Sequence, residues 1–289
     1  MIHALQAPFS DTFVRGFRKL VKKPGGAFAV TYLSVLIVLA IIMPMIYPLT
    51  YYDTVLASKN SAPSFQNWFG TDELGRDIFI RIFWGARISL FVGIVAACLD
   101  VFIGMVYGAI SGYLGEKTDE IMMRIVDVFH SIPNLLIIIM LMVVLGNGIF
   151  TIILAMACTG WINMARLIRT QVLRTKELDF VIASRAYGAS PYWVIRKHLL
   201  PNCMGTIFTT LTFSIPVAIF TETFLSFLGL GVQAPIASWG TMASDGLNGA
   251  DFYPWRLIFP ALFISMTMLA FNLLGDGLRD VFDEKLDRR

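Results

Sequence analysis

The sequence predicts an all-α membrane protein with six transmembrane helices and both termini in the cytoplasm. Three observations support this fold class. Hydrophobic residues make up 56% of the 289 residues and charged residues only 15%, whereas an ordinary soluble domain is about 25% charged. Apolar runs long enough to cross a bilayer recur along the chain. Basic residues concentrate in alternate connections between these runs, which is typical of cytoplasmic segments.

The first transmembrane helix is expected near residues 27–50. Residues 27–52 carry no charge, and about 20 residues suffice to cross a bilayer. The run is too long for the apolar core of a cleaved signal peptide, and no small-residue cleavage site follows it. We therefore expect this helix to remain in the mature protein.

Five further apolar runs predict the other helices, near residues 87–112, 121–145, 149–170, 203–230 and 256–279. Residues 131–165 are uncharged throughout and are divided by the turn at Gly146-Asn147-Gly148. The helices on both sides of that turn must extend into charged flanks. Thr71 and Asp72 are expected to cap the second helix.

The positions of the basic residues predict the orientation. Eighteen of the 23 Lys and Arg lie in the tail 1–26, in the loops 113–130 and 166–202, or from Arg279 onward. Because positive charge stays in the cytoplasm, residues 1–26 and 280–289 are predicted to be cytoplasmic tails. They flank a transmembrane domain at 27–279 with an extracellular loop at 51–86 and a cytoplasmic loop at 170–202. This asymmetry accounts for the net charge of +3, so no nucleic-acid partner is predicted.

The long cytoplasmic loop has its own helical pattern. Residues 177–187 contain few helix breakers, and Gly188 follows where a helix commonly ends in the left-handed conformation. Ser190 and Pro191 match an N-cap and first helical position, and predict a second short helix at 191–200 that Pro201 ends. Apolar side chains in the pair are Phe180, Ile182, Tyr187, Tyr192 and Trp193. The pair is either a docking surface for a soluble partner or an amphipathic unit on the membrane surface.

No catalytic or metal site is predicted, and no cofactor is expected in this chain. Cys98, Cys158 and Cys203 lack paired spacing, and His3, His130 and His198 are scattered singly. Gly112–Thr118 reads GYLGEKT, but a phosphate-binding loop needs Gly where Glu116 stands and a strand before it. We therefore expect the chain not to bind ATP.

Two acids and three glycines stand out within the apolar runs. Because a charge near the middle of a bilayer costs on the order of 3 kcal/mol, Asp100 and Glu222 should face protein or water. Glu222 is expected to line a cavity or to pair between helices, and Asp100 to be a packing partner. Two consecutive GxxxG steps favour close helix contact within a bundle or at a subunit interface: Gly104, Gly108 and Gly112.

The cytoplasmic loop contains Gly188 followed, after nine residues, by the sequence HLLP at 198–201. With this pattern it resembles the conserved loop of ABC importer permeases. That family's Glu-Ala-Ala falls on Ile182-Ala183-Ser184, where only Ala183 is retained. The resemblance implies a coupling helix that docks on a cytoplasmic ATPase. The implied docking residues are Ile182, Ala183, Ser184, Tyr187, Gly188, His198, Leu200 and Pro201.

Four other segments resemble the C-type permeases of the peptide/nickel branch of that family: residues 70–90 (GTDELGRDIFIRIFWGARISL), 226–232 (SFLGLGV), 238–240 (SWG) and 275–283 (GDGLRDVFD). The resemblance implies a type I importer permease in a bacterial inner membrane, without catalytic activity. Implied partners are a second homologous permease, two cytoplasmic ATPase subunits that bind the ATP, an extracellular solute-binding protein and the lipid bilayer.

The resemblance implies oligopeptides or dipeptides as cargo, with nickel or glutathione as alternatives. Two other function classes fit the sequence less well. A secondary transporter working alone would show inverted repeats and broken helices with ion-coupling groups, and a membrane enzyme would need a cluster of His and carboxylates. Both alternatives leave the long basic loop without a role.

Overall fold

The computed structural model describes residues 18–286, and for 283–286 the backbone alone. The predictions for residues 1–17 and 287–289 of the two cytoplasmic tails lie outside the described part. Within 18–286 the chain is helical and forms no β-strand. The α-helices are α2 (Pro24–Ile46), α3 (Ile78–Leu114), α4 (Glu116–Ser131), α5 (Asn134–Leu145), α6 (Ile149–Ala157), α7 (Trp161–Thr175), α8 (Asp179–Ala186), α9 (Pro191–Val194), α10 (Leu200–Phe227), α11 (Trp239–Leu247) and α12 (Trp255–Leu286).

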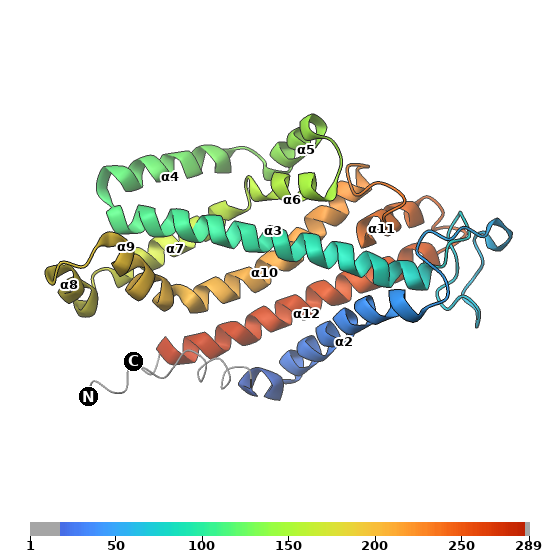
Figure 1. Cartoon of the computed structure of the whole chain (residues 1–289), viewed down its shortest axis with the longest axis horizontal. Helices are drawn as coiled ribbons and strands as arrows, with labels where there is room; N and C mark the ends of the chain where they lie inside the picture. The colour runs from blue at the N-terminus through green and yellow to red at the C-terminus, as the bar shows by residue number, and fades with distance from the viewer. Residues whose placement is uncertain (1–17, 287–289) are drawn as a thin grey trace.

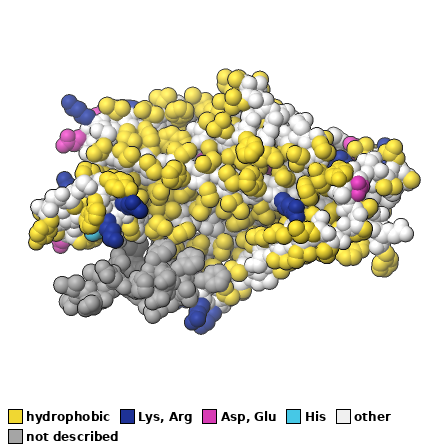
Figure 2. All heavy atoms as spheres, viewed as in Figure 1, with side chains coloured by type: hydrophobic (Ala, Val, Ile, Leu, Met, Phe, Trp, Pro, Cys, Tyr) yellow, Lys and Arg dark blue, Asp and Glu magenta, His cyan; other side chains and the backbone are white. Residues whose placement is uncertain are grey.

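The long helices run roughly along one axis, and α2 lies beside α12 along one side of the bundle (Figure 1). Five spans are long and apolar enough to cross a membrane, and the pair α4–α5 makes a sixth if it counts as one broken span. On the face in Figure 2, hydrophobic side chains cover most of the surface and the acidic side chains lie toward the two ends. The predicted six-span membrane architecture is therefore confirmed, with one span broken.

The third predicted span, 121–145, is wrong as a single straight helix. The axis bends by 81° between α4 and α5. Ile132 is extended (φ −92°, ψ 131°) because the ring of a following proline disfavours helical backbone, and Pro133 has no N–H to continue the ladder. The predicted turn at Gly146 is confirmed, since α5 ends at Leu145 and Gly146 has φ +82°.

The second span was predicted too short, because α3 begins at Ile78 rather than near residue 87. Two charged side chains inside this stretch have partners elsewhere in the chain. Arg81 lies 3.5 Å from an Asp72 carboxylate oxygen, and Arg87 donates hydrogen bonds to the carbonyl oxygens of Ala40 (2.6 Å) and Ile41 (2.8 Å). The last part of the predicted extracellular loop 51–86 is therefore buried helix.

The predicted caps of the second helix are also wrong. Asp77 caps α3 by accepting a hydrogen bond from the Ile80 N–H (3.2 Å). Thr71 instead donates to the Ser58 carbonyl oxygen, and Asp72 accepts from Arg76 Nε (2.6 Å). Both residues therefore make contacts within the α2–α3 connection and fold it back on itself. The sequence does not reveal these contacts, because a predicted N-cap considers only the residues next to the helix.

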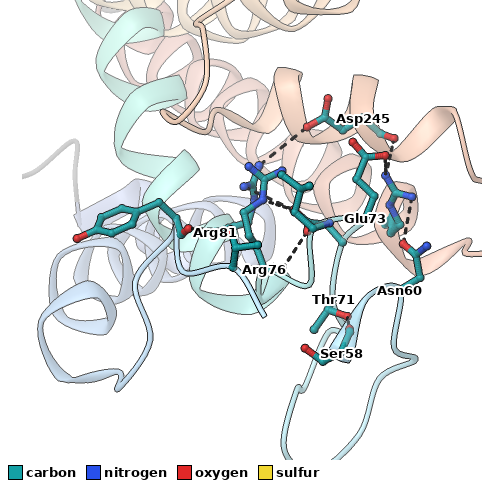
Figure 3. A network of polar contacts seen from close by, with 12 residues as sticks. Ser58, Asn60, Thr71, Glu73, Arg76, Arg81 and Asp245 are labelled. Atoms are coloured by element: carbon teal, nitrogen blue, oxygen red, sulfur yellow. Dashed lines mark hydrogen bonds and ion pairs between the residues drawn. The ribbon is translucent and has the colours of Figure 1, made fainter. Parts of the chain in front are cut away.

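A charged network joins the α2–α3 connection to α11 and α12 (Figure 3). The buried Arg256 donates to Glu73 (3.2 Å), to Asn60 (3.3 Å) and to the backbone carbonyl oxygen of Asp245 (3.0 Å). Arg81 lies 4.0 Å from the Asp245 carboxylate. This end of the bundle is therefore held by ion pairs between segments far apart in the sequence.

Candidate functional site

The predicted docking loop lies between α7 and α10 and carries α8 and α9. In Figure 1, α8 lies at the end of the bundle where α2 begins and α12 finishes. The α2–α3 connection lies at the opposite end. The loop and the outer ends of the first and last spans therefore share one side.

Gly188 forms the elbow that the sequence predicts. Its φ is +82°, and two hydrogen bonds close the end of α8: the Gly188 N–H donates to the Arg185 carbonyl oxygen (3.0 Å), and the Ala189 N–H donates to that of Ser184 (3.2 Å). This pair of bonds is the Schellman motif, which places its glycine in the left-handed conformation. A Cβ added at Gly188 would meet no atom within 4 Å, so backbone conformation alone requires the glycine.

The second helix begins as predicted but does not end at Pro201. The Ser190 hydroxyl accepts a hydrogen bond from the Trp193 N–H (3.3 Å), and Pro191 occupies the first turn. Residues Ile195–Leu199 then form a π-helical turn, in which the Leu200 N–H donates to the Ile195 carbonyl oxygen. Pro201 sits in the first turn of α10, where a missing N–H is tolerated. The helix thus continues from Pro191 to Phe227.

The loop has one buried and one exposed face. Val181, Val194 and Leu199 are fully buried and pack with Met164, Ile168 and Val172 of α7 and with Val101 of α3. The side chains on the other face are exposed: Phe180, Ile182, Tyr187, Tyr192 and Trp193. Tyr187 is the extreme case, with 94% of its surface accessible. The loop is therefore anchored to the bundle while presenting an aromatic surface outward.

His198 connects the two parts of the exposed face. Its ring lies 5.6 Å from the Phe180 ring and 4.9 Å from the Trp193 ring, centroid to centroid. Beside it, Phe180, Tyr187, Gly188 and Trp193 line a surface hollow of about 480 Å³. The hollow is shallow and apolar-rimmed, a shape that suits an inserted side chain of another protein.

The other predicted docking residues divide between the two faces. Ile182 and Ala183 are exposed on α8, as is Pro201 at the start of α10. Leu200 is half-buried and packs against the anchoring cluster. Ser184 is half-buried and lines the same hollow as Phe180 and Trp193, and its hydroxyl has no hydrogen-bond partner among the described residues.

Close packing of α3 against α7 supports the loop. A Cβ on Gly104 would lie 2.5 Å from the Trp161 carbonyl oxygen, and one on Gly112 would lie 2.9 Å from that of Arg169. The predicted GxxxG contact is therefore made within this chain. Arg169 also forms a two-bond ion pair with Asp119 of α4, its Nε donating at 2.5 Å.

Glu222 pairs between structural elements, which is one of the two expected roles. Its carboxylate is fully buried and accepts hydrogen bonds from Ser89 of α3 (3.2 Å), Ser226 of α10 (2.9 Å) and Ser238 (2.7 Å). Ser238 is also the N-cap of α11. The carboxylate therefore ties α11 to α3 and α10.

Asp100 lines a cavity, contrary to the expectation that it is chiefly a packing partner. The cavity has a volume of about 450 Å³ and lies between α3, α10 and the junctions α4–α5 and α6–α7. The Asp100 Oδ1 atom is buried and has no hydrogen-bond partner among the described residues. The carboxylate is accommodated because residue 160 is glycine, and a Cβ there would overlap it.

Sequence reasoning missed the anchoring residues Val181, Val194 and Leu199. Each of them is a single apolar residue on the inner face of a short helix. A short helix has too few turns to show a hydrophobic periodicity that would identify its buried face. The network of Arg81, Arg256 and Asp245 could not be predicted from the sequence, because Arg81 is far along the chain from the other two residues.

Comparison with known proteins gives a consistent result. Residues 104–288, more than half of the chain, match the family described as "Binding-protein-dependent transport system inner membrane component". The oligopeptide transport system permease protein OppC of Bacillus subtilis is 57% identical over 87% of this chain and 82% of its own length. The dipeptide transport system permease protein DppC of the same organism is 52% identical over 94% and 85%. OppC of Haemophilus influenzae is 40% identical over 93% and 87%.

Proposed function

This chain belongs to the family of binding-protein-dependent transport system inner membrane components, and from that membership we infer that it is the permease subunit of an ATP-driven importer of oligopeptides or dipeptides. It is a multi-pass protein of the inner membrane. Its B. subtilis relatives are named for oligopeptide and dipeptide transport, which favours peptides over nickel or glutathione as cargo.

The chain works as one component of a larger system. The relatives imply a permease, ATPase and binding-protein system. The specific partners that we propose are a second homologous permease, two cytoplasmic ATPase subunits and an extracellular solute-binding protein. ATP binds to the ATPases, and this chain carries no cofactor or catalytic site of its own. In the proposed orientation α8 and both termini face the cytoplasm.

The exposed aromatic face of the 179–199 segment carries the proposal for ATPase docking. Tyr187, Phe180 and Trp193 are exposed at one end of the bundle, while Val181 and Val194 hold the same segment against α7. Exposed aromatic residues beside a hollow are typical anchors of protein interfaces. Because the helix runs without interruption from Pro191 into α10, a displacement of the docked segment passes directly to the fifth span.

Alternating access follows from this linkage. Closure of the ATPase pair moves the docked α8–α9 segments of both permeases. Each segment moves its fifth span, α10, which packs against α3 and α7. Because α3 and α7 are themselves in close contact, the three helices move as one body. The pore between the two permeases thereby opens on the opposite side of the membrane.

Co-purification with the ATPase subunits tests the docking proposal. Tyr187→Asp puts a charge at the centre of the proposed interface and should abolish ATPase recruitment and peptide uptake while the permease still inserts. Tyr52→Asp is the matched control, because Tyr52 is also exposed (53%) but belongs to the α2–α3 connection. Equal ATPase recovery with both variants would refute docking at this face.

A further inference from the structure

The cavity beside Asp100 has the chemical features of a ligand site. It lies at the middle of α3 and α10, and its polar lining includes Asp100, His130, Asn134, Asn163, Ser214 and Thr221. Neither lysine nor arginine is among the described residues that line it. A carboxylate in a membrane-embedded cavity without a basic partner is costly, and such residues characteristically mark a substrate or ion pathway.

Helix interruptions converge on this cavity. The bend at Ile132–Pro133 begins α5, and the Thr159 hydroxyl at the α6–α7 junction donates to the Asn134 side-chain oxygen. Interrupted helices near the bilayer midplane expose backbone polar groups, and membrane transport proteins use them to form substrate sites. The convergence therefore supplies hydrogen-bonding groups around the single carboxylate.

The Asp100 carboxylate is poised for a cationic ligand. Its Oδ1 accepts no hydrogen bond from the described residues, whereas the equally membrane-embedded Glu222 accepts three. Gly160 leaves just enough room for the carboxylate beside α7. Glu222 thus has a structural network, whereas the Asp100 side chain borders the cavity and its buried Oδ1 has no hydrogen-bond donor among the described residues.

We propose that this cavity receives a primary ammonium group of the peptide in transit, with Asp100 as its charge partner. The inference rests on the proposed function, since it assigns a substrate contact to a peptide permease. The ammonium group belongs either to the amino terminus of the peptide or to a lysine side chain. A carboxylate of low solvation attracts both equally.

Uptake by the complete transporter in proteoliposomes tests the proposal with tetra-alanine as the probe. Asp100→Asn keeps the size of the side chain and removes its charge, so the tetra-alanine concentration for half-maximal uptake should rise about tenfold, as expected for one lost charge contact. Asp127→Asn is the control, because its carboxylate is on α4, is exposed, and pairs with Arg166 at the surface. A half-maximal concentration that Asp100→Asn leaves unchanged both for tetra-alanine and for an N-acetylated peptide that contains lysine overturns the inference, whereas absence of tetra-alanine uptake by the wild-type transporter overturns the peptide function itself.

Two acetylated peptides distinguish the sources of the ammonium group. If the amino terminus is the ligand, N-acetyl-tetra-alanine should be taken up equally by the wild type and by Asp100→Asn. An effect of Asp100→Asn on an N-acetylated peptide that contains lysine would assign the contact to the side chain. A tenfold effect on N-acetyl-tetra-alanine, which has no ammonium group, would contradict the proposal.

A labelling experiment measures the charge in the cavity directly and separates it from a structural role. Ser214→Cys, in a transporter whose native cysteines are replaced by alanine, is labelled with a cationic and an anionic methanethiosulfonate reagent. With Asp100 present the cationic reagent should react several-fold faster than the anionic one, and Asp100→Asn should abolish this preference. A preference that Asp100→Asn leaves unchanged would show that the carboxylate exerts no field on the cavity, and would overturn the proposal.

Discussion

Gly108 of α3 lies directly against the carbonyl oxygen of Ala165 in α7, so that a Cβ at position 108 would overlap that oxygen. The atom in the way is backbone, which cannot rotate aside. Helices α3 and α7 both border the Asp100 cavity and both pack against the docking loop. The contact at Gly108 holds these two helices at a separation that only glycine permits.

Gly108→Leu should therefore force α3 away from α7. Overpacking typically costs about 1–3 kcal/mol, so the thermal unfolding temperature of the purified permease in detergent should fall by several degrees. Gly148→Ala is the control, because its Cβ would have no neighbour closer than 3.7 Å. Equal unfolding temperatures for Gly108→Leu and the wild type would contradict the close contact.

Gly188→Val should uncouple the permease from its ATPase without disturbing insertion. Valine reaches φ +82° only with strain of roughly 1–3 kcal/mol, so the Schellman turn should open and misplace α8. Asparagine is of similar size but tolerates the left-handed conformation, so Gly188→Asn should keep ATPase co-purification and uptake. Normal uptake by Gly188→Val would show that the elbow is dispensable and would favour a membrane-surface role for α8.

Glu222→Leu should destabilise the attachment of α11. The substitution leaves the Ser89, Ser226 and Ser238 hydroxyls without their shared acceptor, and an unsatisfied buried polar group costs about 1–3 kcal/mol. Glu222→Gln retains one acceptor oxygen and should lose less. Limited proteolysis at residues 228–250 should accelerate in the leucine variant first, and equal cleavage in all three proteins would refute the role of the carboxylate.

Cysteine labelling checks the proposed orientation. Ala186 ends α8 and Asn248 follows α11, and both are exposed. In Figure 1, α8 and α11 lie toward opposite ends of the bundle. In a protein without native cysteines, Asn248→Cys should react with an impermeant maleimide in intact cells. Ala186→Cys should react only after the membrane is permeabilised. The reverse pattern would place α8 outside and would exclude docking on a cytoplasmic ATPase.

The number of spans and the Gly188 elbow follow from local properties of the chain. Apolar length is set by the thickness of the bilayer, and a left-handed residue is decided by neighbours within a few positions, as are Ser190 and Pro191 at the next helix start. These signals are short-range, so they can be read from consecutive residues.

Contacts between distant residues required the tertiary structure. The charges of Arg81 and Arg87 led to a predicted start of the second span near residue 87, whereas α3 begins at Ile78. The partners that allow these charges inside the helix, Asp72, Ala40 and Ile41, come from other segments of the chain. Glu222 and Asp100 look alike in sequence, each an isolated acid in an apolar run. Only folding gives Glu222 three hydroxyl donors and leaves Asp100 beside a cavity, because the cost of a buried charge depends on which segments pack around it.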